Sequence, residues 1–300
     1  MRSKGMMAAF VVVLLWGLLY PLVKFGYQVM GLEGAGNLLL FTAFRFLFCG
    51  GVITVFTAIR QPGEFKTLKN GWVAVLLVGL FAVGLHYGFT SVGLRLTESS
   101  KTAILKQIGT VLYVCFAGFF FPADKLTVRK LAGLLLGVLG IVVINADGGA
   151  LHFGLGEILI LTASLCSVCA NIISKKISQK VTPIVLTGVS QLFGGAILLC
   201  IGLCSGGKVT EALPNAWDGA LVFGGIVAAS VISYCLWYLT VQKENLSKLF
   251  IIRFSEPLFA AVMSWMMLGE NIFKWEYGIA FLLISGGILV VNMKKKEKAV

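Results

Sequence analysis

Residues 101–106 read KTAILK, and residues 248–253 read KLFIIR. Further along the chain, residues 140–145 read GIVVIN, and residues 287–292 read GILVVN. Both matches have the same offset of 147 residues, which is about half of the 300-residue chain. A single long offset between similar apolar stretches indicates a membrane protein built from two copies of one unit.

The composition supports a chain that lies in a bilayer. Hydrophobic residues make up 58% of it, charged residues only 13%, and the mean hydropathy is +0.93. A soluble domain carries roughly 25% charged residues, so this chain has too few polar groups to cover a water-facing surface. The net charge of +12 is spread over short loops and both ends. We therefore expect the lipid bilayer as a partner and no nucleic acid.

Long apolar stretches predict an all-α membrane protein with ten transmembrane helices, because a helix needs about 20 apolar residues to cross the bilayer. Turn sequences rich in Gly, Pro, Asn and Asp separate most of these stretches. The predicted spans are 6–30, 37–59, 71–94, 102–121, 127–145, 155–178, 182–205, 217–240, 248–268 and 274–293.

The distribution of Lys and Arg predicts the orientation. If the N-terminus is inside, 17 of the 25 basic residues fall in inside segments, four in outside segments and four within spans. This bias places both termini in the cytoplasm, and the first span is expected to be retained rather than cleaved as a signal peptide. Five spans per unit is an odd number, so residues 1–146 and 147–300 are predicted to be two five-helix repeats of inverted topology. In such folds the substrate binds near the midplane, between the repeats.

Charged residues within predicted spans are the first candidates for a binding site, because each costs about 2.5–3.5 kcal/mol at the centre of an inserted helix. Arg45 lies near the middle of the second span, among phenylalanines. Lys106 and Arg253 are separated by the repeat offset of 147. Two alternatives stay open: Arg45 is a structural arginine held by carbonyl groups, or Lys106 and Arg253 reach back to the membrane interface.

Glu256 is the acidic residue placed most clearly within a predicted span. It lies three residues after Arg253, on the same helix face, and Pro257 follows it. A buried carboxylate beside a cavity can bind and release a proton, which favours a role in coupling. The alternative is a fixed ion-pair partner for Arg253.

Aromatic and polar residues complete the predicted substrate-binding set. Aromatic rings at helical spacing can line a site for an organic ligand, although packing explains each ring equally well. The amide can hydrogen-bond across helices or face the ligand. These residues are Trp16, Tyr20, His86, Tyr87, Asn171, Tyr234 and Trp237.

Several motifs together resemble the EamA-type members of the drug/metabolite transporter superfamily. Trp16-Gly17 followed by Pro21 and Lys24 is similar to that family's first span, and Arg45-Phe46 to its second. The ninth span and its exit, residues 256–260 and 268–270, are the most similar. The resemblance covers nearly the whole chain and implies ten spans arranged as five plus five. The first repeat has Gly109-Thr110 where the second has Glu256-Pro257, so equal roles for the two halves are not implied.

The sequence predicts a secondary transporter of the cytoplasmic membrane that moves a small organic metabolite by alternating access. Three cations against one carboxylate favour a substrate with a carboxylate or phosphate, such as an amino acid, and proton coupling fits Glu256. Alternatives are a carrier for cationic, choline-like drugs or for a lipid-linked substrate, a non-transporting membrane partner and, least favoured, an intramembrane enzyme. No catalytic, cofactor or metal site is expected: Cys166 and Cys169 form only one pair, and no nucleotide or hydrolase motif occurs. The oligomeric state is left open, a homodimer included.

Overall fold

The computed structural model of the chain describes residues 2–109, 112, 120, 127–144, 146–147, 150–151, 153–177, 180–214, 216–243 and 256–292. In these ranges the chain is helical apart from a two-residue antiparallel pair, β1 (Ala146–Asp147) with β2 (Ala150–Leu151). The first half contains α1 (Arg2–Val29), α2 (Gly34–Arg60), η1 (Pro62–Asn70), α3 (Trp72–Gly79), η2 (Leu80–Leu85), α4 (His86–Leu96), α5 (Ser99–Lys106) and α7 (Val128–Ile144). The second half contains α8 (Leu155–Ile177), α9 (Pro183–Cys204), α10 (Val209–Ala212), α11 (Trp217–Lys243), α13 (Glu256–Leu268) and α14 (Trp275–Asn292).

Six helical segments in the described part of the chain are long and apolar enough to cross a membrane. They are Phe10–Val29, Gly34–Arg60, Trp72–Leu96, Leu155–Ser174, Pro183–Cys204 and Trp217–Leu236. Each overlaps one of the predicted spans. The predicted spans 102–121 and 248–268 are described only in part, as α5 and α13, with remaining residues that lie outside the described ranges.

The outer surface of the bundle is apolar, as lipid contact requires. Phe48, Ile59 and Leu282 are 52%, 72% and 69% exposed. Water would solvate such side chains poorly, whereas hydrocarbon tails match them. The protein is therefore a multi-pass membrane protein.

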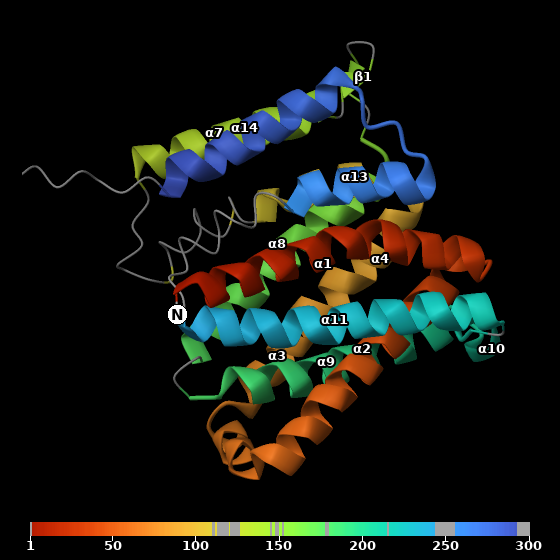
Figure 1. Ribbon diagram of the computed structural model, residues 1–300, viewed down its shortest axis with the longest axis vertical. Coiled ribbons are helices and arrows are strands. Elements are labelled where there is room, and N and C mark those ends of the chain that lie inside the picture. Colours follow the sequence, from red (N-terminus) through yellow and green to blue (C-terminus); the bar gives the residue numbers. More distant parts are fainter. Residues whose placement is uncertain are drawn as a thin grey trace, which may run out of the picture.

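Helices that are equivalent under the 147-residue offset pack against each other. α2 contacts α9, and α7 contacts α14. Figure 1 shows α7 and α14 side by side at the top of the view, above α13. Another contact comes in an equivalent pair: α1 packs on α11 as α8 packs on α3 and α4. This pattern is what a two-fold relation between two repeats produces.

The α7–α14 contact depends on two glycines that the repeat makes equivalent. A Cβ on Gly140 would lie 3.1 Å from the carbonyl oxygen of Ala280, and a Cβ on Gly287 would lie 2.7 Å from that of Gly133. Small residues let two membrane helices approach until their backbones touch. The repeated segments GIVVIN and GILVVN therefore begin with the residues that join the two repeats.

Candidate functional site

Eight of the eleven predicted site residues form one connected cluster in the middle of the bundle. Six helices contribute to it: α1, α2, α4, α5, α11 and α13. The eight residues are Trp16, Tyr20, Arg45, His86, Tyr87, Lys106, Tyr234 and Glu256. The other three are Arg253, Trp237 and Asn171. Arg253 and the side chain of Trp237 lie outside the described residues. Asn171 lies on the exposed surface of α8, where its amide donates to the carbonyl oxygen of Ser167.

Arg45 is the buried cation of the cluster, with 6% of its surface exposed. Its Nε donates to the Ser230 hydroxyl at 2.9 Å, and its guanidinium carbon lies 5.1 Å from the Phe46 ring centre and 5.6 Å from that of Tyr87. No carboxylate among the described residues pairs with it. Hydrogen bonds and ring faces offset part of the cost of burying this charge, but no protein anion in the described structure neutralises it.

Lys106, from α5, brings a second cation to the side chains of α4. Its ammonium lies 3.1 Å from Nε2 of His86 and donates to the Thr90 hydroxyl at 3.2 Å. It also lies 5.2 Å from the ring centre of Tyr87 and 5.6 Å from that of Tyr20. Two cations therefore contact Tyr87, one from α2 and one from α5.

Glu256 supplies the carboxylate at the start of α13 and is 3% exposed. The Tyr20 hydroxyl donates to its Oε1 at 3.0 Å. Gly17 makes this contact between α1 and α13 feasible: a Cβ there would lie 2.8 Å from Cβ of Phe259 and 3.0 Å from the carbonyl oxygen of Glu256. The glycine next to the predicted Trp16 therefore sets how closely the two helices approach.

The aromatic residues hold the centre of the cluster together. The Tyr87 and Tyr234 hydroxyls lie 2.6 Å apart, and the Trp16 ring packs edge-on against Tyr234 at 6.4 Å. Phe46 packs on Tyr87 at 4.4 Å. His86 and Tyr87 directly follow η2, a π-helical segment in the third span. Such a segment shifts the helix register by one residue and is common at functional sites.

Two residues of the cluster, Thr90 and Ser230, were not predicted from the sequence, and Phe46 was named only as part of the Arg45-Phe46 motif. Helical spacing was the available signal. Thr90 is four residues after His86, and Ser230 is four residues before Tyr234, so each shares a face with a predicted residue.

A second polar network lies at the end of the bundle where α5 begins. The Glu270 carboxylate accepts hydrogen bonds from the backbone N–H groups of Ser99 (2.7 Å) and Ser100 (3.0 Å) and from the Ser100 hydroxyl (2.8 Å). It also pairs with the Lys24 ammonium at 3.2 Å. Gly269, with a φ of +66°, turns the chain so that Glu270 reaches the α5 N-terminus. Glu270 thereby satisfies the first N–H groups of α5 and ties α13 to α1.

Burial raises the pKa of Glu270, but the hydrogen bonds from Ser100 and Ser99 and the charge of Lys24 outweigh it, so the net pKa is lowered. Lys24 also donates to the carbonyl oxygen of Thr97 at 2.6 Å. The Thr97 hydroxyl in turn donates to Glu157. Glu157 pairs with Lys101 at 2.8 Å, which extends the network to α8.

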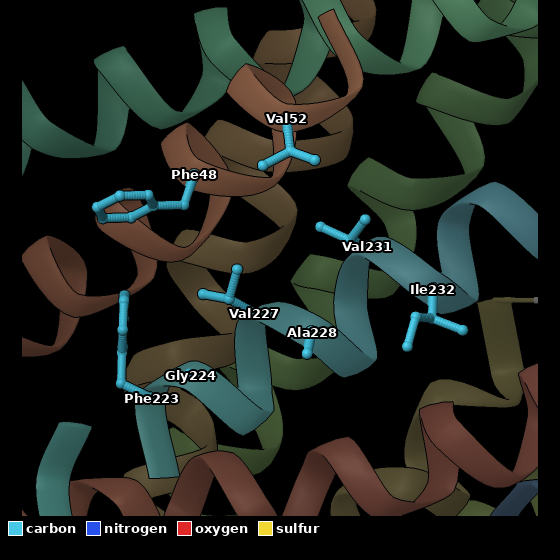
Figure 2. A pocket seen from close by; sticks show the side chains of 8 residues that line it. All are labelled: Phe48, Val52, Phe223, Gly224, Val227, Ala228, Val231 and Ile232. Atoms are coloured by element: carbon cyan, nitrogen blue, oxygen red, sulfur yellow. The ribbon is translucent and has the colours of Figure 1, made fainter. Parts of the chain in front are cut away.

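An apolar groove of about 550 Å³ lies between α2 and α11, away from the polar cluster. Figure 2 shows the side chains that line it, among them Phe48 and Val52 from α2 and Phe223 and Ile232 from α11. Its lining has no polar surface, and Phe48 and Val52 are about half exposed. It is a lipid-facing surface groove and lacks the polar groups that orient a ligand.

Comparison with known proteins defines the class to which this architecture belongs. The model of the EamA-like transporter family matches the chain twice, at residues 3–146 and 154–293. The chain therefore belongs to the EamA-like transporter family, within the drug/metabolite transporter superfamily.

Individual relatives carry the same class name. A protein of Haemophilus influenzae called an uncharacterized transporter is 25% identical over 99% of this chain and its own full length. The uncharacterized transporter YetK of Bacillus subtilis is 26% identical, over 86% of this chain and 79% of YetK. The chloroplastic WAT1-related protein At3g02690 of Arabidopsis thaliana is 25% identical over 83% of this chain and 61% of its own length. One solved crystal structure, 20% identical, shares the fold with a TM-score of 0.64 over 97% of this chain and 96% of its own.

Proposed function

We propose that this transporter is secondary-active and that it moves, by alternating access, a small organic metabolite that bears a carboxylate or phosphate. The observation that carries the proposal is Arg45, a buried guanidinium with no carboxylate partner in the described structure. A carboxylate or phosphate on the substrate would supply the missing negative charge, with the aromatic rings beside it contacting the organic body. An amino acid or a related metabolite has this chemistry.

The same geometry disfavours a cationic drug as the substrate. An aromatic cage binds a cation through ring faces that are free to receive it. Here Arg45 and Lys106 already contact Tyr87, at 5.6 Å and 5.2 Å from the ring centre, and both would repel a second cation. The cationic carrier is therefore the second candidate, and one ligand screen separates the two.

The proposal includes ten spans, two inverted repeats over residues 1–146 and 147–300, and both termini on the cytoplasmic side of the cell membrane. The bias of 17 inside against four outside basic residues supports the orientation. The two matches of the family model and the equivalent helix contacts support the repeats. A site at the contact between two such repeats is reached from each side in turn as the repeats rock against each other.

The test is a thermal-shift screen of the purified protein against amino acids, dicarboxylates, sugar phosphates and quaternary ammonium compounds. A ligand that binds the folded protein raises its melting temperature. We expect hits among the anions. Arg45→Gln should weaken binding of a hit about tenfold or more, since a charge-assisted hydrogen bond contributes about 1.5–3 kcal/mol. Arg95→Gln, an exposed arginine at the end of α4, is the matched control. Hits confined to cations, or an Arg45→Gln variant that binds anions normally, would contradict the proposal.

A further inference from the structure

The position of one proton on His86 follows from its neighbours. Nδ1 of His86 lies 2.7 Å from the carbonyl oxygen of Ala163, in α8. A carbonyl oxygen can only accept, so Nδ1 carries the hydrogen. Nε2 lies 3.1 Å from the ammonium nitrogen of Lys106, which can only donate. Nε2 must then present its lone pair, and the ring is neutral with its single N–H on Nδ1.

The lone pair on Nε2 can bind either the ammonium of Lys106 or a proton, and the two compete for it. We propose that His86 is a proton-controlled anchor for Lys106, whose Nε2 holds either the lysine ammonium or a proton, and never both. A proton from solution that binds Nε2 would place two N–H donors 3.1 Å apart, each on a positive group. The ammonium of Lys106 would have to leave His86. The inference rests on the proposed function, because it assigns a role to Lys106 in binding an anionic substrate.

The neighbouring side chains hold the His86 ring in place and determine which charges surround it. His86 is 7% exposed, and its ring packs perpendicular to Tyr87 at 4.6 Å. The charged or titratable groups around it are Lys106 from α5, Tyr87 on its own helix, Arg45 from α2 on the Tyr87 ring, and Glu256 from α13 through Tyr20 of α1; α8 contributes the Ala163 carbonyl.

Lys106 therefore has an alternative partner nearby. It lies 5.6 Å from the ring centre of Tyr20, whose hydroxyl is bonded to Glu256. After release from His86, its ammonium is available to a carboxylate, either that of Glu256 or that of a substrate.

The consequence is a linkage between protons and anions. If a proton on His86 frees Lys106 to bind an anion, then a bound anion must favour the proton by the same factor. Proton and anionic substrate would bind together, and binding of the anion would tighten as the pH falls. His86 on α4 carries this linkage in substrate binding, whereas Glu256 is a separate group whose substitution should leave binding and exchange intact.

Solid-state NMR of the full chain in lipid can test the exchange without any substrate. The chain has only two histidines, so His152→Gln leaves the ring of His86 as the single source of histidine side-chain signals. The probe is ¹⁵N in the histidine ring together with ¹³C at the lysine Cε. At alkaline pH we expect a neutral ring with its N–H on Nδ1 and a through-space contact from Nε2 to a lysine Cε. Lys106→Met should abolish that contact, and Lys69→Met, at an exposed position in η1, should leave it intact.

Acidification gives the decisive measurement. We expect the second N–H signal to appear on the ring and the lysine contact to disappear together. The proposal is overturned by an N–H on Nε2 at alkaline pH, by a contact that survives in the doubly protonated ring, or by a ring that stays neutral until the protein unfolds.

A second measurement separates this proposal from the proposed function. Glutamine at position 86 can accept from Lys106 but binds no proton, so His86→Gln should bind an anionic hit with a weaker dependence on pH than the wild type. If no anion binds while the NMR exchange is observed, the assigned substrate class fails and the exchange stands. If anions bind to wild type and His86→Gln with the same pH dependence, the role of His86 fails and the substrate class stands.

Discussion

The hydroxyl groups of Tyr87 and Tyr234 lie 2.6 Å apart, and the two tyrosines are separated by the repeat offset of 147 residues. Each is the other's equivalent under this offset, so the proposed two-fold axis between the repeats would pass between them. Their hydrogen bond joins α4 to α11 at the centre of the candidate site. A duplicated chain has here brought two copies of one residue into direct contact.

The first prediction concerns this pair. Tyr87→Phe and Tyr234→Phe should each lower the free energy of unfolding by about 1 kcal/mol, because each leaves the other hydroxyl without this partner. The double variant should cost little more than either single variant. A double-mutant cycle measured by thermal or denaturant unfolding in detergent gives the coupling energy. Strictly additive effects would show that the hydroxyls do not interact.

The second prediction concerns Gly17, where α1 and α13 meet. Gly17→Ala places a Cβ 2.8 Å from Phe259 Cβ and 3.0 Å from the Glu256 carbonyl oxygen, so the helices must separate. The Tyr20–Glu256 hydrogen bond should weaken, and anion binding should fall along with stability. Gly225→Ala is the control, since a Cβ there meets nothing within 4 Å. Equal melting temperatures for the two variants would disprove the tight α1–α13 contact.

The third prediction concerns the acid stability that Glu270 provides. Its pKa is lowered in the folded protein, so its stabilisation is complete above the ordinary glutamate pKa of about 4.3 and is lost as the pH falls through the lowered value. Glu270→Gln removes the charge, so the variant should be less stable at neutral pH by about 2 kcal/mol and should lose less on acidification. Melting temperatures between pH 7 and pH 3 measure both effects. Glu33→Gln, at an exposed residue without a side-chain cap hydrogen bond, should follow the wild type.

The fourth prediction concerns Glu256 as a carrier of the coupling proton. Glu256→Gln should retain substrate binding and exchange but lose uphill transport driven by a pH gradient. Uptake into proteoliposomes with and without an imposed gradient makes the comparison. A variant that still concentrates substrate in response to pH would leave Glu256 the role of a hydrogen-bond partner for Tyr20. A wild-type protein indifferent to pH would remove proton coupling altogether.

The fifth prediction concerns the proposed topology. Single cysteines near Gly34 and Gly149 should react with a membrane-impermeant reagent from outside intact cells, in a variant without native cysteines. Tags at either terminus should be reached only after the cells are opened. Termini that react on opposite sides of the membrane would rule out ten spans.

The repeat and the charged candidates for the site could be predicted from the sequence because both are visible in short stretches of it. The 147-residue offset indicated that Tyr87 and Tyr234 are equivalent, and the rarity of charge within spans singled out Arg45, Lys106 and Glu256. The partners of these charges could not be predicted. The sequence offers Arg253, three residues away, as one possible partner of Glu256, and Arg253 lies outside the described residues. The described partner is Tyr20, 236 residues away in the chain. Such pairs depend on the rotation and crossing of helices, which a single sequence does not encode locally.

The third span is a second case in which the structure depends on contacts that the local sequence does not reveal. Its apolar pattern predicted an uninterrupted helix over 71–94, and the structure has the π-helical η2 within it. The segment LFAVGL contains no proline or polar residue that signals an irregular helix. This segment packs against α9, which belongs to the other half of the chain. The approach is close: a Cβ added to Gly194 in α9 would lie 2.5 Å from the carbonyl oxygen of Gly79.

The ion pair between Lys24 and Glu270 has no copy under the repeat. The position equivalent to Lys24 is Asn171, which is neutral and bonds only locally to Ser167 among the described residues. Two identical repeats of opposite orientation would make opening toward either face of the membrane equally costly. An ion pair without a repeat-related copy would favour one of the two states, and each 1.4 kcal/mol of difference is about a tenfold ratio in population. In the proposed alternating-access cycle, duplication would supply two pathways related by a two-fold axis, and later substitution would give the cycle a preferred resting side.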